Sequence, residues 1–200
     1  EQMEKNLAQM ERAPMSITEV SSKKAPVKEV VLKGEKADLD LLPILTHNEF
    51  DGGPYVNAAA LICKERRTAS YNMGIYRHHK QGKRQLGLMI NPANHASYVR
   101  AEYEDQNETM EVALAIGHHP ALILSAVTKQ PGIGGELEVA GAFLQEPLEM
   151  VKAETVDLLV PARAEIIIEG IVSPHKRHHE GPFGEWPHYY FKEGDEPFIQ

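Results

Sequence analysis

The sequence predicts a mixed α+β domain in which short antiparallel strands form a β-barrel or a bent sheet with flanking helices. One observation is a series of short apolar or alternating runs separated by polar turns, which is typical of successive antiparallel strands. Another is the presence of several segments with helical periodicity between and after these runs. The composition, with 42% hydrophobic and 25% charged residues in a chain of 200, suits one sizeable globular core.

The expected elements follow one another along the chain. Residues 1–14 read as a short amphipathic helix that Pro14 ends, and residues 16–42 as an extended charged segment. The runs expected to form strands are 56–66, 68–77, 84–90, 110–117, 164–172 and, as a strand pair, 148–162. The segments expected to be helical are 93–106, 135–144 and 119–127, the last being either a short helix or a buried apolar run. We expect the residues after Pro174 to be loop and turn.

The domain organisation expected from length is one large domain at 15–200, preceded by a linker or helix at 1–14. Because the sequence begins inside a helical pattern without an initiator Met, we expect it to be a piece of a longer protein.

Charge and cysteine usage exclude several classes of function. The formal net charge of −8 argues against a nucleic-acid partner, and the short basic run at 77–84 reads as a solvated hairpin rather than a binding arm. A single cysteine, Cys63, fits a reducing compartment, and its apolar surroundings indicate a buried, inert thiol. No run reaches membrane-spanning length, and the N-terminus lacks an apolar signal core. We therefore expect a cytoplasmic protein that does not bind membranes.

The stretch EGPFGE places two carboxylates, Glu180 and Glu185, in a segment shaped by proline and glycine. Pro182 removes a backbone N–H and Gly184 permits unusual backbone angles, so this is a shaped loop rather than a helix. Phe183 lies between the acids, and carboxyl groups beside apolar side chains suit general acid catalysis near neutral pH. The alternative is a surface turn with two solvated acids. An arginine could pair with both, and Arg77, at the end of a core strand, is the candidate.

A second, scattered set of candidates could hold a metal ion. Asn72 lies on a predicted strand, while His95 and Glu136 each begin a predicted helix. Each also has an ordinary explanation, as a strand polar residue, a helix cap and a first-turn acid facing the helix dipole. The glycine-rich residues 132–135, before a helix, are a weak phosphate-binding signal because the spacing of a dinucleotide loop is absent.

Taken together, EGPFGE, the preceding strand EIIIEG and the upstream stretches NMGIYR and INPANH resemble the central domain of the UbiD family of (de)carboxylases. This resemblance covers roughly residues 42–190. It implies a split β-barrel of the flavin-reductase, FMN-binding type at 15–200. It also implies a carboxy-lyase: reversible, non-oxidative decarboxylation of an aromatic or α,β-unsaturated acid through a prenylated-FMN adduct. The alternatives are a non-catalytic flavin- or phosphate-binding module on the same barrel, or an interaction domain without a cofactor.

The resemblance also implies roles for particular residues. Glu185 would donate the proton, and Glu180 would complete a network with Arg77 that orients the substrate carboxylate. Asn72, His95 and Glu136 would bind Mn²⁺ or Mg²⁺ on the cofactor phosphate. Glu136, with the segment from Ser125 to Thr128, would also bind K⁺. The full set of cofactor-binding residues implied is Asn72, Ile75, Arg77, Asn94, His95, Ser125, Thr128 and Glu136.

The partners that the resemblance implies are a small carboxylic acid as substrate and a flavin prenyltransferase that supplies the cofactor. Family members are about twice as long as this chain, with a further α/β domain over the active site and a C-terminal region that oligomerises. We therefore expect the full-length protein to form a homo-oligomer.

Overall fold

The structure, a computed structural model, describes residues 2–129, 134–191 and 193–200. The chain divides into two compact units. The first consists of Glu1–Val30, Ala58–Ile75 and Glu111–Glu169, and the second of Val31–Asn57, Tyr76–Met110 and Gly170–Gln200. Both contain helices and antiparallel strands, so the predicted mixed α+β class is confirmed. The flavin-reductase type of split barrel stays a prediction.

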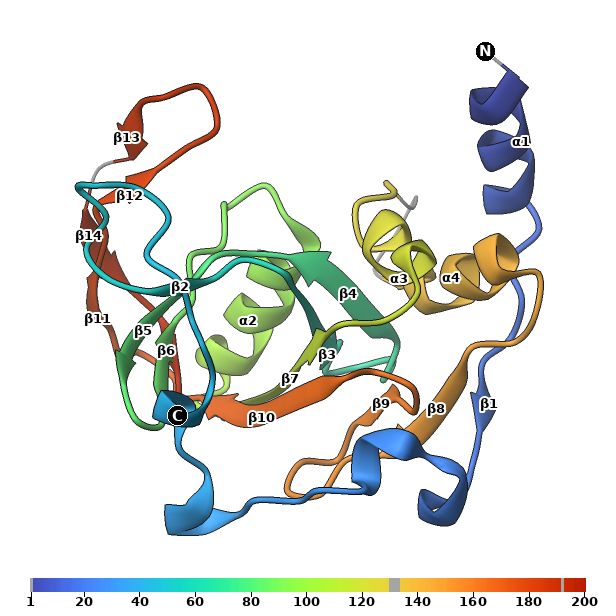
Figure 1. Cartoon of the computed structure of the whole chain (residues 1–200), viewed down its shortest axis with the longest axis horizontal. Coiled ribbons are helices and arrows are strands. Elements are labelled where there is room, and N and C mark those ends of the chain that lie inside the picture. The colour runs from blue at the N-terminus through green and yellow to red at the C-terminus, as the bar shows by residue number, and fades with distance from the viewer. Residues whose placement is uncertain (1, 130–133, 192) are drawn as a thin grey trace. The chain divides into compact units, whose positions relative to one another are not determined.

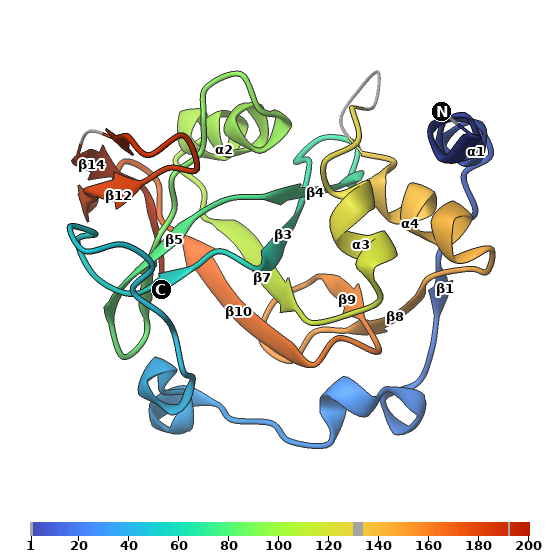
Figure 2. The same ribbon diagram turned by 45° about the horizontal axis from the view of Figure 1, so that its top comes forward.

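The first unit combines a run of antiparallel strands with three α-helices. Strand β3 pairs with β4 on one side and with β7 on the other, and both pairs are antiparallel. Strand β8 pairs in parallel with β1 and antiparallel with β9. Helices α3 and α4 lie side by side against β3 and β4 (Figures 1 and 2). The elements are α1 (Gln2–Glu11), β1 (Thr18–Glu19), η1 (Ser22–Lys24), η2 (Pro26–Lys28), β3 (Ala59–Lys64), β4 (Tyr71–Ile75), β7 (Met110–Ile116), α3 (Pro120–Ser125), α4 (Glu136–Leu144), β8 (Glu149–Lys152), β9 (Leu159–Pro161) and most of β10 (Ile166–Val172).

The core of the first unit forms where α3 and α4 pack on β3 and β4. Ile62, Met73, Leu137 and Met150 are each at most 1% exposed and belong to one hydrophobic cluster. Because Ala59–Cys63 in β3 are all buried, this strand is apolar on both faces, which a strand in the interior of a layered domain requires. The core thereby fixes the ends of β4 and α4, from which two of the candidate metal ligands project.

The second unit contains short strands, one helix and several loops. Strand β5 pairs antiparallel with β2 and β6, β6 pairs with β15, and β15 pairs with β10 at Val172. Two separate hairpin-like pairs, β11 with β14 and β12 with β13, carry the EGPFGE stretch. The elements are η3 (Gly34–Lys36), η4 (Leu39–Leu41), β2 (Tyr55–Val56), β5 (His78–Gly82), β6 (Gln85–Gly87), α2 (His95–Asp105), β11 (His178–Glu180), β12 (Phe183–Gly184), β13 (Tyr190–Phe191), β14 (Gly194–Glu196) and β15 (Phe198–Ile199).

Two expectations about the second unit are wrong in part. The basic run at 77–84 forms a hairpin with the residues after it, and its residues 82–84 are exposed, but His78 and His79 are buried. The reason is that β5 is an inner strand between β2 and β6, which covers the side chains at its start. The residues after Pro174 are not all loop and turn, since β11 to β15 form there as very short strands.

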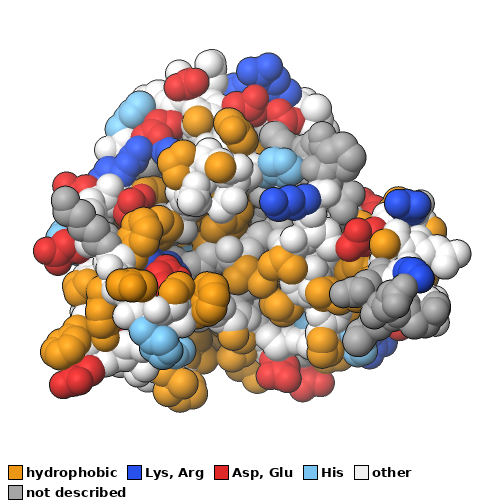
Figure 3. Space-filling view, turned by 90° about the horizontal axis from the view of Figure 1, so that it is seen from above, with side chains coloured by type: hydrophobic (Ala, Val, Ile, Leu, Met, Phe, Trp, Pro, Cys, Tyr) orange, Lys and Arg blue, Asp and Glu red, His pale blue; other side chains and the backbone are white. Residues whose placement is uncertain are grey.

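The surface mixes charges and apolar groups. On the face drawn in Figure 3, Lys and Arg side chains are interspersed with Asp and Glu, and hydrophobic side chains lie among them. Several large aromatic side chains of the second unit are exposed, namely Phe50, Trp186, Tyr189, Tyr190 and Phe191. In the part of the chain that the structure describes, no helix combines the length and apolar character needed to cross a bilayer.

Candidate active site

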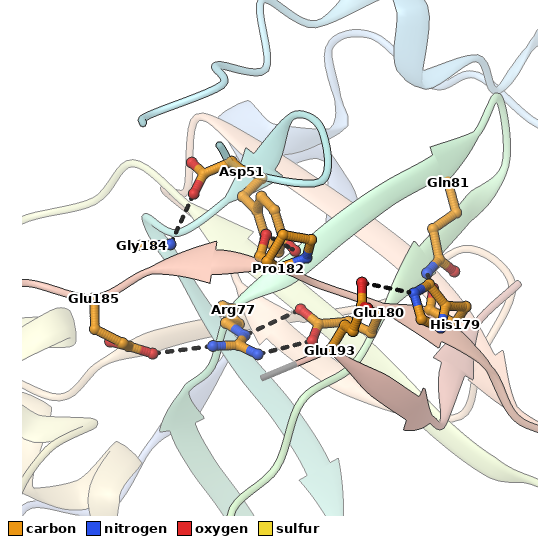
Figure 4. A network of polar contacts seen from close by, with 10 residues as sticks. Asp51, Arg77, Gln81, His179, Glu180, Pro182, Gly184, Glu185 and Glu193 are labelled. Carbon is orange, nitrogen blue, oxygen red and sulfur yellow. Dashed lines mark hydrogen bonds and ion pairs between the residues drawn. The ribbon is translucent and has the colours of Figure 1, made fainter. Parts of the chain in front are cut away.

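The second unit brings Arg77 and the two acids of EGPFGE together. The Arg77 guanidinium donates from Nε to Glu180 Oε1 at 3.0 Å and from Nη2 to Glu180 Oε2 at 2.7 Å. Its Nη1 donates to Glu185 Oε1 at 3.0 Å. Figure 4 shows the guanidinium between the two carboxylates, with one on each side. The arrangement expected from the EGPFGE spacing and from the position of Arg77 is therefore present in the structure.

The two carboxylates differ in how they meet the arginine. Glu180 is 1% exposed and accepts hydrogen bonds from Arg77 through both of its oxygens, the two-pronged geometry typical of arginine–carboxylate pairs. Glu185 is 40% exposed and is bound to Arg77 through one oxygen only. The geometry therefore makes Glu180 a fixed counter-ion, whereas Glu185 has an oxygen that the arginine does not occupy.

Two aromatic rings confine the guanidinium. The Arg77 Cζ atom lies 5.0 Å from the ring centroid of Phe183 and 5.0 Å from that of Phe191, within the range of a cation–π contact. Phe183 and Phe191 are paired residues on β12 and β13. Because Arg77 is 8% exposed and Glu180 1% exposed, the charge interaction between these two residues is stronger than at an open surface.

The EGPFGE loop reaches this geometry through backbone positions that differ from those of a regular strand. Gly181 has a φ of +97°, a backbone angle that residues other than glycine rarely adopt, and the Gly181–Pro182 peptide bond is cis. After β12, Glu185 N–H donates to Tyr189 O at 2.9 Å and His188 N–H to Glu185 O at 2.9 Å, which closes a turn at the end of the β12–β13 hairpin. Glu180 therefore ends one strand and Glu185 follows another, and the loop turns both toward Arg77.

A second loop, residues 47–55 (HNEFDGGPY), lies against EGPFGE, and the sequence reasoning did not give it a role. Asp51 Oδ1 accepts from Gly184 N–H at 2.7 Å, and Asn48 Nδ2 donates to Gly184 O at 3.1 Å. Gly52 N–H donates to Pro182 O at 2.7 Å. Figure 4 shows the Asp51–Gly184 contact beside the arginine network. The signal in the sequence was the DGGP run, whose turn chemistry parallels that of EGPFGE.

Tyr55 is a further residue of the site that the sequence reasoning missed. Its side chain is 2% exposed and stacks on His79, with ring centroids 4.6 Å apart. Its hydroxyl donates to Pro182 O at 3.4 Å. Burial raises the pKa of Tyr55, and so do the charge of Glu180 and a hydrogen bond to it. Tyr55 therefore stays neutral and interacts with Glu180.

Two of the three predicted metal ligands meet in the first unit. Asn72 on β4 and Glu136 at the start of α4 are both 2% exposed, and Asn72 Nδ2 donates to Glu136 Oε1 at 3.4 Å. Asn72 Oδ1 is buried without a hydrogen-bond partner. Burial raises the pKa of Glu136, and the N–H groups near it only partly oppose this. A buried orphan amide oxygen beside a desolvated carboxyl group is a donor set suited to a hard cation.

The third predicted ligand, His95, begins α2 in the second unit, whereas Asn72 and Glu136 belong to the first. Asn94 is the N-cap residue of that helix, although its side chain makes no capping hydrogen bond. In the described ranges there is no group of three or more His, Cys, Asp and Glu side chains that could hold a metal ion. A shared site for Asn72, His95 and Glu136 therefore stays a prediction.

The remaining predicted residues lie in the first unit. Ser125 and Thr128 are at the C-terminal end of α3, where the Ser125 hydroxyl donates to Leu122 O and the Thr128 hydroxyl to Ser125 O. Ile75 ends β4. Burial raises the pKa of the Cys63 thiol to about 12, as expected for an inert thiol. The glycine-rich residues 132–135 fall partly outside the described residues.

An arginine clamped between a buried and a partly exposed carboxylate, on an antiparallel α+β framework, defines a domain able to orient an anion and exchange a proton. The comparisons assign it more closely. A model of the UbiD family, described as the 3-octaprenyl-4-hydroxybenzoate carboxy-lyase Rift-related domain, matches residues 18–200. The chain belongs to this family.

Relatives and solved structures agree with this assignment. The chain is 39% identical over 164 residues to anhydromevalonate phosphate decarboxylase of Methanothermobacter thermautotrophicus, covering 82% of this chain and 38% of the relative. It is 33% identical over 165 residues to phenolic acid decarboxylase of Bacillus subtilis, covering 80% and 35%. The chain thus spans a little over a third of the length of these curated relatives.

Among solved structures, an evolved dimeric form of the UbiD-class enzyme HmfF from Pelotomaculum thermopropionicum, in complex with prFMN, matches with a TM-score of 0.94 and 41% identity. The match covers 98% of this chain and 46% of that one. Apo 3,4-dihydroxybenzoic acid decarboxylase (AroY) of Klebsiella pneumoniae matches with a TM-score of 0.92 and 27% identity, covering 100% and 44%.

Proposed function

We propose that this chain is the cofactor-binding central domain of a prenylated-FMN-dependent carboxy-lyase, which acts on an aromatic or α,β-unsaturated carboxylic acid. The observation that carries the proposal is the placement of Arg77 between Glu180 and Glu185 in a partly buried, aromatic-lined site. Family membership and the likeness to a structure containing prFMN support the same reading. The domain would occupy residues 15–200 of a longer, homo-oligomeric, cytoplasmic protein.

In the reaction, the chain's own residues orient one carboxylate and deliver one proton. Arg77 would bind the substrate carboxylate, and Glu180 fixes the orientation of the guanidinium through two hydrogen bonds, from Nε and Nη2. When the C–C bond breaks, CO₂ leaves and the electron pair remains on the substrate carbon. Glu185, with one oxygen outside the arginine contact, gives that carbon a proton. In the carboxylation direction the same group removes the proton.

Candidate residues for the cofactor and its ions are found in each of the two units. Prenylated FMN, when bound, supplies the electron sink for the bond that breaks. The buried Asn72 oxygen and the desolvated Glu136 carboxyl group fit a divalent cation on the cofactor phosphate, with His95 as a third ligand. Mn²⁺ or Mg²⁺ is the expected ion there. K⁺ would bind near Glu136 and the segment from Ser125 to Thr128, and Ile75 and Asn94 would contact the cofactor.

The test uses the full-length protein produced together with a flavin prenyltransferase. We expect a bound flavin heavier than FMN by one prenyl unit, seen by intact cofactor mass and absorbance. We expect CO₂ release from a panel of aromatic and α,β-unsaturated acids. Glu185→Gln should lower kcat by about 10²-fold or more while leaving flavin absorbance unchanged. Glu193→Gln, an exposed acid of the same unit, is the matched control and should change neither.

Two outcomes would refute the proposal. Full activity in Glu185→Gln would remove the proton-donor role from that residue. A protein that binds plain FMN, with no dependence on Glu180 or Glu185 and no CO₂ release, would instead indicate a non-catalytic flavin-binding module.

A further inference from the structure

We propose that Asp51 is a positioning residue for decarboxylation: through the backbone of Gly184 it fixes the turn that presents Glu185 to Arg77. This inference rests on the proposed function, because it assigns a role around the proposed proton donor. The feature behind it is the 47–55 loop, which contains the run DGGP and has no part in the mechanism described so far.

The Asp51 carboxylate joins the 47–55 loop to the turn that bears Glu185. Its Oδ1 accepts from Gly184 N–H at 2.7 Å, and its Oδ2 accepts from the N–H groups of Asn48 at 2.8 Å and His47 at 3.1 Å. The Asn48 amide donates to Gly184 O at 3.1 Å. Both backbone polar groups of the residue before Glu185 are therefore held by one short loop.

The contact is close enough to exclude a side chain at position 184. A Cβ atom on Gly184 would lie 2.6 Å from Asn48 Nδ2, and one on Gly52 would lie 2.2 Å from Gly181 O. The two loops thus approach closely at two points, with the Asn48 side chain against Gly184 and the backbone of Gly181 against Gly52. Since two glycines permit this approach, the turn can shift little while the 47–55 loop keeps its place.

A negative charge suits this position better than a neutral amide does. Burial would raise the pKa of Asp51, but hydrogen bonds from the N–H groups of Gly184 and Asn48, among others, outweigh it and lower the pKa. Asp51 therefore stays ionised while Glu185 gains and loses its proton. An asparagine here would turn an NH₂ group toward backbone N–H donors, because an amide has only one acceptor oxygen.

The proton donor depends on this support because its own contacts are few. Among the residues that the structure describes, Arg77 is the hydrogen-bond partner of the Glu185 side chain, through one oxygen. The place of that carboxyl group is therefore set mainly by the backbone turn, and Asp51 binds the turn one residue earlier. A displacement on the order of 1 Å at a reacting group costs about 10²-fold in rate.

The test compares Asp51→Asn with Asp105→Asn in the full-length holoenzyme. Asp105 is an exposed acid in α2 of the same unit, so both variants lose one negative charge. For Asp51→Asn we expect kcat to fall about 10- to 100-fold with KM within about twofold, because Arg77, which binds the substrate, keeps Glu180 as its partner. Hydrogen exchange in the peptide covering residues 183–191 should be about tenfold faster, since a charge-assisted bond is lost. Asp105→Asn should change neither quantity.

The proposal is overturned if Asp51→Asn keeps the wild-type kcat, or if kcat and exchange change equally in both variants. It is also overturned if KM rises while kcat stays constant, because that result would place Asp51 in substrate binding. Should Asp51→Asn not fold, Asn48→Ala removes the amide that donates to Gly184 O and to the Asp51 carboxylate, and an unchanged kcat there refutes the inference. If the wild-type holoenzyme decarboxylates no acid, the proposed function fails, while the exchange at 183–191 still tests the Asp51 contact.

Discussion

Removing the charge of Glu180 should lower the stability of the second unit far more than removing that of Glu185, although both acids bind the same arginine. Arg77 is 8% exposed and makes three hydrogen bonds to acids, and two of these go to Glu180, which is 1% exposed. The Glu180→Gln change removes this buried charge partner. Breaking a buried pair by removing one partner typically costs about 3–5 kcal/mol, and the glutamine oxygen still accepts one bond. We therefore expect a loss of about 3 kcal/mol in the stability of this unit.

Glu185→Gln provides the comparison within the same network. Glu185 is 40% exposed and makes one bond to Arg77, so solvent screens the pair and the expected loss is at most about 1 kcal/mol. The assay is native-state hydrogen exchange of peptides within residues 170–200 of the full-length protein, as a function of denaturant, which reports the free energy of local opening. An equal loss of stability in the two variants, or a larger loss in Glu185→Gln, would refute the distinction between Glu180 as a fixed counter-ion and Glu185 as a more weakly held acid.

Three further predictions concern other parts of the site. Burial lowers the pKa of His78 to about 4 from the ordinary value of 6.5. The free energy of unfolding should therefore fall by up to about 3 kcal/mol as the pH drops from 6.5 to 4. The variant His78→Phe should remove this contribution, as measured by urea titrations at each pH. Tyr55→Phe removes the hydroxyl that interacts with Pro182 O and Glu180. It should lower stability by about 1 kcal/mol, measured by denaturation, and kcat severalfold, measured by steady-state kinetics. Glu136→Gln should weaken Mn²⁺ binding by about tenfold or more, measured by metal titration, because a neutral amide replaces the carboxylate.

Much of the fold was readable from the pattern of apolar residues. The helix expected at 135–144 is α4, and the strand expected at 164–172 contains β10, because each segment has enough apolar residues at the right period to identify it alone. The short strands near the C-terminus were missed because two or three residues cannot show a period. Strand β12, at Phe183–Gly184, exists through its pairing with β13 rather than through its own propensity.

The site was predictable where residue types carry chemistry and unpredictable where the backbone does. Glu180 and Glu185 stood out because two acids flank a Pro–Phe–Gly turn, and Arg77 because a cation ends the stretch NMGIYR. The strand predicted to end at Arg77 ends two residues earlier, at Ile75. Asp51 accepts a hydrogen bond from a backbone N–H more than a hundred residues away, and the local sequence cannot predict the partner in such a contact. The burial of His78 was missed for a related reason, since the place of β5 between β2 and β6 is a long-range property of the sheet.

The charges of the proposed site also link proton delivery to substrate binding. Glu180 and Glu185 together carry two negative charges against the single positive charge of Arg77, so the network as drawn holds a net charge of about −1 when both acids are ionised. A substrate carboxylate at Arg77 would add a second negative charge in surroundings where phenylalanine rings replace water. A neutral Glu185 side chain would relieve that repulsion and leave the two-oxygen contact between Glu180 and Arg77 intact. This charge balance supports the proposal that Glu185, rather than Glu180, is the proton donor.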